Sequence, residues 1–227
     1  SNSMETVSAF IPIDRRHALS RRRLLPDRTA GAVLFADISG FTHLTSVLSQ
    51  ELGSQRGAEE ISIQLDRIYG VMIARVHDYA GSVISFSGDA ITCWFDDDPI
   101  GADVAHSGAV RATACALTIQ SVIDNLGRVR TPGGQAISVG IKVAVASGAT
   151  RRFLLGQSGE QRFEVLAGNL VDRSAAAEQL LSTGETAVGL EITRQFGAAL
   201  HVREWRSSGT DEQFAIISAL DTVIPSS

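Results

Sequence analysis

The chain has 227 residues, of which 44% are hydrophobic and 20% are charged, and its formal net charge is −5. This length and composition predict one large globular domain with a sizeable core. The acidic balance argues against a nucleic-acid-binding protein, which needs a basic face. The sequence shows no apolar run near the roughly 18 residues of a membrane span and no apolar signal-peptide core. We therefore expect an intracellular, cytoplasmic protein without a transmembrane segment.

The first 28 residues are basic. Ser1-Asn2-Ser3 ahead of Met4 resembles a cloning remnant, and the arginines that follow are Arg15, Arg16, Arg21, Arg22, Arg23 and Arg28. Such a charge run is typical of a solvated arm laid over a domain; docking to a membrane surface or a partner is the alternative. We place the arm at residues 1–28 and the main domain at residues 29–222. The two cysteines, Cys93 and Cys115, stand in apolar surroundings, which favours buried free thiols over a disulfide.

The first half of the domain alternates between short apolar runs and helical patterns. Short apolar runs predict strands, and apolar residues at three- and four-residue spacing predict helices. Gly and Pro clusters predict the breaks between them, including one at Gly53–Gly57. The first expected elements are a strand at Ala30–Asp37, a helix at Phe41–Leu52, and a longer helix with Ile61, Leu65, Ile68, Met72 and Val76 on one face. A hairpin of Ser82–Phe86 and Ala90–Phe95 follows, and then a helix at Ala102–Leu126 with Val110, Ala114 and Leu117 inward. The alternation of Ile137, Val139, Ile141, Val143 and Val145 predicts a fourth strand.

The order of these elements predicts an α+β fold. Strand, helix, strand, strand, helix, strand is the ferredoxin-like βαββαβ arrangement, in which the first and third strands are antiparallel neighbours at the sheet centre. Further elements extend the same domain, namely Arg152–Gly156, a strand at Arg162–Leu166, a helix at Asn169–Leu181, a strand at Thr186–Leu190, a helix at Glu191–Phe196, and strands at Leu200–Trp205 and Phe214–Ile217.

Two aspartates are brought together by this topology. Asp37 ends the first strand, and Asp89 sits in the Ser87-Gly88-Asp89 turn that begins the third. Two carboxylates with the carbonyl of Ile38 are hard oxygen ligands that suit Mg²⁺ or Mn²⁺. Each aspartate alone has an ordinary explanation, since Asp37 is placed to cap a helix and Asp89 to form a turn. Their pairing favours a metal site.

Residues beside the aspartates suit phosphate. The chain leaves the first strand through Ser39, Gly40, Phe41 and Thr42 directly into a helix, and the free N–H groups of a helix N-terminus bind anions. Lys142 is the only lysine. It shares a strand face with Ser138, Gly140, Ala144 and Ala146, and these small residues leave room for the ammonium to reach a phosphate. The alternative is a sheet lysine that extends its ammonium to solvent.

The motifs Phe35-Ala-Asp-Ile-Ser-Gly-Phe-Thr42 and Phe86-Ser-Gly-Asp-Ala90 resemble those of class III nucleotidyl cyclase catalytic domains, most of all the first catalytic half of bicarbonate-responsive soluble adenylyl cyclases. The likeness runs from about Thr29 to Trp205. It implies a head-to-tail dimer with a second cyclase domain. In that dimer two metal ions, held by Asp37, Asp89 and the Ile38 carbonyl, convert a nucleoside triphosphate, ATP by preference, to a cyclic nucleotide and pyrophosphate. Lys142 matches a phosphate-contacting lysine of that family.

Three positions depart from the family pattern. Ser85 stands where the family has a purine-reading lysine, and Asp172 and Ala176 stand at the positions of its transition-state asparagine and arginine. Arg173 is one helical turn from the position of that arginine but is not assigned its role. The resemblance therefore implies a metal-binding half whose partner domain, expected in a longer chain, supplies the missing groups, with little activity alone. The alternative is a non-catalytic, cyclase-like module for dimerisation and regulation; a diguanylate cyclase is disfavoured because the turn lacks paired acids.

Overall fold

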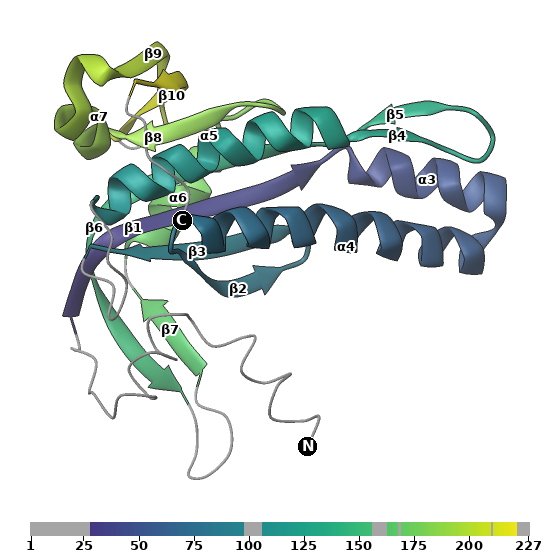
Figure 1. The fold of residues 1–227 in the computed structure, drawn as a ribbon, viewed down its shortest axis with the longest axis horizontal. Helices are drawn as coiled ribbons and strands as arrows, with labels where there is room; N and C mark the ends of the chain where they lie inside the picture. The colour runs from purple at the N-terminus through teal and green to yellow at the C-terminus, as the bar shows by residue number, and fades with distance from the viewer. Residues whose placement is uncertain (1–27, 98–105, 156–162, 168, 210, 222–227) are drawn as a thin grey trace.

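The computed structural model describes residues 28–97, 106–155, 163–167, 169–209 and 211–221. Apart from Arg28, the basic arm expected at residues 1–28 lies outside the described residues. Figure 1 shows a mixed sheet with α4 and α5 on one face and α6 on the other. The elements are β1 (Arg28–Ser39), α3 (Phe41–Leu52), α4 (Ser54–Asp78), β2 (Ser82–Ser87), β3 (Ala90–Asp96), α5 (Gly108–Leu126), β4 (Arg128–Arg130), β5 (Ala136–Ser138), β6 (Gly140–Leu155), β7 (Phe163–Ala167), α6 (Asn169–Glu178), β8 (Thr186–Gly189), α7 (Leu190–Phe196), η1 (Gly197–Ala199), β9 (Leu200–Ser207) and β10 (Gln213–Leu220).

The sheet confirms the α+β class and the ferredoxin-like core. Its strand order is β2-β3-β1-β6-β8-β10-β9, with β7 paired to β6. β1 is antiparallel to both β3 and β6, so the first and third strands are central neighbours as expected. The register pairs Asp37 with Ala90 on one side and with Lys142 on the other. Two predicted site residues, Asp37 and Lys142, therefore lie side by side in the sheet, and the third, Asp89, is next to Ala90 in sequence.

Alternation along β1 separates two faces. Ala32, Leu34, Ala36 and Ile38 enter the main core together with the buried side of α4 and α5. Val33 instead packs with Trp94, Ala146 and Leu170 on the side of α6. Because side chains two residues apart share a face, Asp37 and Ser39 point to the α6 side. The two cysteines are buried and free, as predicted.

The predicted fourth strand is two strands. All five alternating residues from Ile137 to Val145 are buried, so the periodicity is correct, but continuity is lost at Val139. Its N–H donates to the Gly127 carbonyl at 2.7 Å, and β5 pairs with β4 in a separate two-stranded ribbon. β6 begins at Gly140 and runs on to Leu155. An alternating apolar pattern indicates which side of a strand is buried, but it does not indicate where the strand changes its hydrogen-bonding partner.

Two helix predictions need correction. The break expected at Gly53–Gly57 is a single residue, Gly53, and Gly57 lies inside α4. A Cβ on Gly57 would stand 3.0 Å from the Leu48 carbonyl oxygen, so this glycine allows α3 and α4 to approach closely. In α5, the predicted inward residues Val110, Ala114 and Leu117 are only half-buried. The core stripe of α5 consists of Ala109, Ala112, Cys115, Ala116, Ile119 and Ile123.

The described part of α5 begins at Gly108, and the expected start at Ala102 falls among residues outside the description. α6 ends at Glu178, three residues before the predicted end at Leu181. The remaining strands and α7 lie within a few residues of their predicted bounds. None of the helices in the described residues is both long and apolar enough to cross a membrane.

Candidate active site at the end of β1

The turn after β1 depends on one glycine. Gly40 has φ +85° and precedes α3 as its N-cap residue. A Cβ there would lie 2.6 Å from the Ser138 carbonyl oxygen, so an L side chain would meet both strain and a clash. The chain can therefore pass from Asp37 to the first N–H groups of α3 within three residues. Phe41 is half-buried and Thr42 is exposed, so this helix start faces solvent.

Asp37 and Asp89 meet, as the topology predicted. The Ile38 N–H donates to the Asp89 carbonyl at 3.0 Å, which fixes the turn against β1. Because the N–H and C=O of a strand residue point to the same side, the Ile38 carbonyl also faces that turn. The Asp37 and Asp89 side chains are close enough that Asp89 raises the pKa of Asp37. The three predicted metal ligands are thus on one side of one turn.

The surroundings of Asp37 disfavour its ionised form. Burial, the charge of Asp89, the charge of Glu178 and the hydrogen bond with Asp89 raise the pKa of Asp37 to about 6, although Lys142 lowers it in part. Like charges in one site disfavour ionisation. Within the described residues no group of three or more acid, histidine or cysteine side chains could hold a metal ion. Two carboxylates and a carbonyl leave ligand positions for phosphate and water oxygens, a donor set that fits Mg²⁺ or Mn²⁺.

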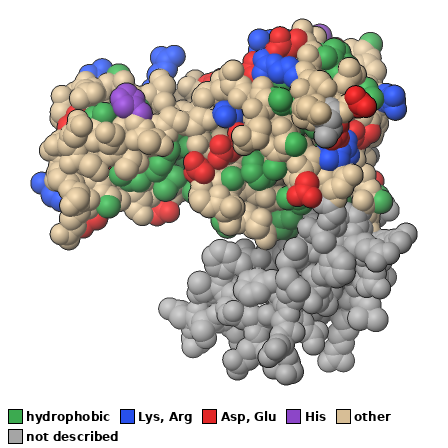
Figure 2. Space-filling model, turned by 180° about the vertical axis from the view of Figure 1, so that it is seen from behind, with side chains coloured by type: hydrophobic (Ala, Val, Ile, Leu, Met, Phe, Trp, Pro, Cys, Tyr) green, Lys and Arg blue, Asp and Glu red, His purple; other side chains and the backbone are tan. Residues whose placement is uncertain are grey.

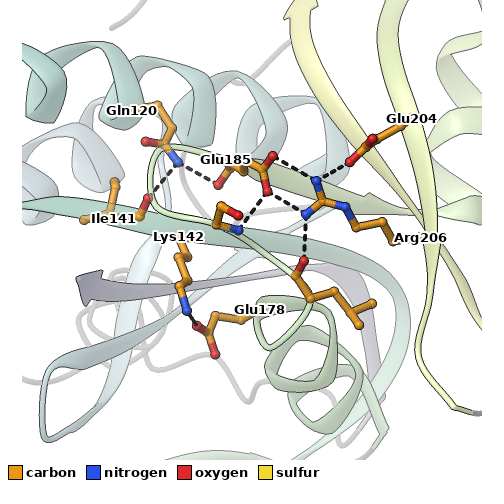
Figure 3. A network of polar contacts seen from close by, with 9 residues as sticks. Gln120, Ile141, Lys142, Glu178, Glu185, Glu204 and Arg206 are labelled. Carbon is orange, nitrogen blue, oxygen red and sulfur yellow. Dashed lines mark hydrogen bonds and ion pairs between the residues drawn. The ribbon is translucent and has the colours of Figure 1, made fainter. Parts of the chain in front are cut away.

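Lys142 is bound to an acid that the sequence analysis did not single out. Its Nζ lies 3.3 Å from Oε1 of Glu178, the last residue of α6, whose side chain is 3% exposed (Figure 3). The small residues beside Lys142 accommodate α6: Ala144 packs with Ala177 and Leu181. The sequence analysis expected these small residues to leave open space, but α6 fills it. In this structure the ammonium is paired with a helix carboxylate, and a phosphate contact by Lys142 stays a prediction. The only signal for Glu178 was an acid directly after the small residues 174–177.

The remaining predicted positions lie apart from the carboxylate pair or have no partner. Ser39 Oγ is buried and has no hydrogen-bond partner among the described residues. Ser85 is exposed on β2, next to an irregularity between Val83 and Ser85. On α6, Asp172 is exposed and Ala176 half-buried. Arg173 forms ion pairs with Glu191, at 2.9 Å, and Glu212, so it is already occupied within its own domain.

Acidic side chains gather near the middle of the face seen in Figure 2, next to hydrophobic patches. This is the face opposite α4 and α5. Phe86 on β2 is 44% exposed, and its ring contacts Tyr69 of α4, so this exposed apolar residue lies on the α4 side of the sheet.

Tyr69 on α4 supports the turn that carries Asp89. Its hydroxyl donates to the Gly88 carbonyl at 3.2 Å, and its ring meets Phe86 edge-on with centroids 5.5 Å apart. Burial and the charges of Asp89 and Asp37 raise the pKa of Tyr69 to about 12. Sequence reasoning missed this residue because a tyrosine next to Ile68 reads as part of the helix's core face.

We expect Tyr69→Phe to loosen the turn without unfolding the domain. Loss of the hydroxyl removes one hydrogen bond, which costs about 1 kcal/mol of unfolding free energy, and it should weaken Mn²⁺-dependent nucleotide binding by roughly threefold to tenfold. Urea unfolding and titration calorimetry measure the two effects. Tyr79→Phe is the control, because the Tyr79 hydroxyl contacts Thr118 on α5, at 2.9 Å. It should cost similar stability and leave binding unchanged; equal effects of both variants on binding would contradict a positioning role for Tyr69.

Comparison with known proteins supports the same fold. The structure of the adenylyl cyclase CyaB from P. aeruginosa superposes with a TM-score of 0.69 at 21% identity, covering 86% of this chain and 96% of that one. The guanylyl cyclase Cya2 gives 0.68 at 20% identity, with 87% and 95% covered. A guanylate cyclase domain from Catenaria anguillulae, solved with GTP, gives 0.67 at 18% identity, with 86% and 100% covered.

This chain has the fold of a class III nucleotidyl cyclase catalytic domain. The resemblance to class III cyclase catalytic domains inferred from the sequence is confirmed, and the curated matches fit the expected closeness to soluble-type cyclases: adenylate cyclase type 10 of Homo sapiens is 23% identical over 161 residues, and that of Mus musculus is 23% identical over 150 residues. These matches cover 71% and 66% of this chain but only 9% of each relative. The chain therefore matches less than a tenth of the length of those curated relatives. No family model matches it.

Proposed function

We propose that this chain is the metal-binding half of an adenylyl cyclase, which forms cyclic AMP and pyrophosphate from ATP at an interface with a second cyclase domain. The observation that carries the proposal is the meeting of Asp37 and Asp89, with the pKa of Asp37 raised to about 6. Two carboxylates held together in this way lose stability unless a cation neutralises them. A protein that kept the fold for scaffolding alone would gain nothing from such a pair.

Each residue has a distinct role in this proposal. Asp37, Asp89 and the Ile38 carbonyl would hold two Mg²⁺ or Mn²⁺ ions, which activate the ribose 3′-hydroxyl and neutralise triphosphate charge. The N–H groups at the start of α3, after Gly40, would bind phosphate oxygens. Lys142 would exchange its contact with Glu178 for the triphosphate. ATP is favoured over GTP because the curated relatives are named adenylate cyclases, although the similar structures include guanylyl cyclases.

The chain does not supply a complete site by itself. Ser85 and Ala176 carry no charge, and Arg173 is held by Glu191 and Glu212. The groups that read the base and stabilise the transition state would therefore come from the partner domain. The proposal predicts that the isolated protein binds Mn²⁺ with ATP weakly and forms little or no cyclic AMP.

Calorimetry with Mn²⁺ and a non-hydrolysable ATP analogue tests the proposal. We expect nucleotide binding that requires the metal and is lost in Asp37→Ala and Asp89→Ala. Addition of a cyclase domain that carries the lysine, asparagine and arginine should raise the rate of cyclic AMP formation. Robust cyclic AMP formation by the isolated chain, unchanged by Asp37→Ala, would refute the assignment.

One observation favours a second candidate, a non-catalytic regulatory module. Lys142 is paired with the nearly buried Glu178, which is the arrangement expected of a lysine that serves to hold α6 on the sheet. Such a module would dimerise through the same face and bind no nucleotide. The same calorimetric titration separates the two candidates, because the module should show no metal-dependent binding.

A further inference from the structure

The last residue of α6 is an acid with almost no access to solvent. The Glu178 side chain is 3% exposed, and it stands at the end of a helix where the free carbonyl groups make a negative charge unfavourable. Its Oε2 accepts a hydrogen bond from Gln179 Nε2 at 2.6 Å. Its Oε1 is buried and accepts no hydrogen bond among the described residues, so the partner of that oxygen is the Lys142 ammonium, 3.3 Å away. Glu178 therefore depends on Lys142 to compensate its charge.

Lys142 forms this pair although another acid lies directly across the sheet. Asp37 is opposite Lys142 in the pairing of β1 with β6, and opposite residues of antiparallel strands share a face. The ion pair of Lys142 within the described residues is nevertheless with Glu178 (Figure 3). The charge of Glu178 also raises the pKa of Asp37 more than Lys142 lowers it. Glu178 thus draws the ammonium away from the carboxylate pair and adds a negative charge beside it.

Of the two partners, Lys142 is the one that can move. The chain just after Glu178 is held by β9, because Arg206 donates to the Leu180 carbonyl at 2.7 Å and pairs with Glu185 at 2.6 Å (Figure 3). The Lys142 side chain is 26% exposed and carries three N–H donors on a flexible stem. Its distance of 3.3 Å from Glu178 exceeds the roughly 2.7–2.9 Å of a strong charge-assisted hydrogen bond. A phosphate group can therefore reach Lys142, whereas it cannot reach Glu178.

We propose that Glu178 is an autoinhibitory carboxylate, which holds the Lys142 ammonium and competes for it with the triphosphate. This inference rests on the proposed function and concerns the regulation of the same site. When a phosphate group takes Lys142, Glu178 stays buried without its partner, and this cost lowers the affinity for the nucleotide.

The same carboxylate has the opposite effect on a metal ion. Within the described residues Asp37, Asp89 and Glu178 do not form a group that could hold a metal ion, so Glu178 acts on this site through its charge and through Lys142. Its negative charge attracts a cation at the aspartates and repels a triphosphate. Metal and nucleotide should therefore respond to the loss of this charge with opposite signs.

Glu178→Gln tests the proposal, because the amide keeps the size of the side chain and removes its charge. Calorimetry measures the binding of Mn²⁺ alone, and of a non-hydrolysable ATP analogue at saturating Mn²⁺. We expect the variant to bind the nucleotide about tenfold more tightly and Mn²⁺ alone about threefold more weakly. A merely structural role of Glu178 would weaken both, because a partly unfolded protein binds less of either. Glu59→Gln, which removes an exposed acid of α4, should change neither.

The single lysine reports on the pair without any nucleotide. Lys142 is the only lysine in the chain, so selective isotope labelling of lysine gives one side-chain ε signal in NMR. Glu178→Gln should shift this signal in the ligand-free protein. In the wild type the ATP analogue should shift it too, with Mg²⁺ in place of Mn²⁺ because Mn²⁺ broadens NMR signals. A signal that Glu178→Gln leaves unchanged would overturn the inference.

The calorimetry distinguishes failure of this inference from failure of the proposed function. Nucleotide binding that Glu178→Gln leaves unchanged or weakens would overturn the inference alone, and the metal-binding half of a cyclase would stand. If neither the wild type nor the variant binds the nucleotide, the proposed function fails and the inference fails with it. Binding that is detected in the variant but not in the wild type would support both.

Discussion

Asp37→Asn is expected to abolish metal-dependent nucleotide binding while stabilising the metal-free protein at neutral pH. The substitution removes a proposed metal ligand that has no substitute among the described residues, so binding of Mn²⁺ with an ATP analogue should fall below detection. In a complete pair of cyclase domains, the rate of cyclic AMP formation should fall by about a hundredfold to a thousandfold, the usual effect of losing a group that stabilises developing charge.

The stability effect has a definite direction with pH. The pKa of Asp37 is raised from 3.8 to about 6, so the folded state holds this proton more tightly than the unfolded state. The stability due to this group is complete below pH 4 and is lost as the pH rises through about 6. Asp37→Asn should remove that loss and exceed the wild type by about 1 kcal/mol at pH 7, after allowance for solvent screening.

Urea unfolding at pH 4.5 and pH 7.5 measures the difference, in roughly the range where Asp37 titrates. The gap between variant and wild type should be small at the lower pH and larger at the higher. Asp172→Asn is the matched control, because Asp172 is an exposed acid on α6; it should change neither stability nor binding. If the variant is less stable than the wild type at pH 7.5, then the closeness of the two carboxylates does not destabilise the folded state.

The sequence was sufficient for the part of the site that topology determines. Short apolar runs gave the strands, their order gave the neighbours of β1, and this order alone placed Asp37 beside Asp89. The register also puts Lys142 opposite Asp37, a pairing that the sequence did not specify. Backbone pairing is repeated over many residues, so an error of one or two residues at a boundary does not change which strands are neighbours.

The sequence did not predict contacts between side chains of different elements. The contact between Lys142 and Glu178 depends on how α6 lies on Ala144 and Ala146, and no pattern within either element specifies that packing. Likewise, Tyr69 supports Asp89 through a backbone carbonyl of the intervening turn, a bond that leaves no trace in residue spacing. Sequence periodicity shows that a position is buried but does not show what it touches.

The prediction of the inward face of α5 was wrong for a related reason. The prediction chose Val110, Ala114 and Leu117, whereas the structure buries Arg111 and the stripe formed by Ala109, Ala112, Cys115, Ala116, Ile119 and Ile123. The small residues in the first half of this stripe allow the helix to lie close to the sheet. An arginine on a helix face normally indicates that the face is exposed to solvent, and Arg111 contradicts that expectation.

Arg111 joins three segments of the chain from inside the protein. Its side chain is among the largest that are fully buried, with an exposed fraction of 1% for the residue. The guanidinium donates to the carbonyls of His106, at 3.1 Å, Tyr79, at 3.0 Å, and Ala80, at 3.1 Å, and also to the carbonyl of Asp96. Burial lowers its pKa, but the nearby charges of Asp96 and Asp97 oppose that change. Arg111 therefore holds the C-terminal end of α4 and the end of β3 against α5.

Arg111→Leu is expected to cause the largest loss of stability of any single substitution considered for this chain. The leucine fills part of the space but leaves the buried carbonyl of Asp96 and the part-buried carbonyls of Tyr79 and Ala80 without their donor, at a cost of about 3–5 kcal/mol. Arg111→Lys should lose less, because the ammonium keeps the charge but cannot reach all four carbonyls in the planar geometry of a guanidinium.

Arg67→Leu is the control for loss of an arginine-to-carbonyl bond at the surface. Arg67 donates to the Leu126 carbonyl at 2.7 Å in an exposed position, where water can replace the donor, so its loss should cost under about 1 kcal/mol. Urea unfolding of the three variants gives the order Arg111→Leu, Arg111→Lys, Arg67→Leu from the largest to the smallest loss. Equal losses for Arg111→Leu and Arg67→Leu would mean that the buried carbonyls find other donors. Because Arg111 bonds at the Asp96 end of β3, opposite the Asp89 turn, the folded fraction of every variant should bind Mn²⁺ and nucleotide as the wild type does.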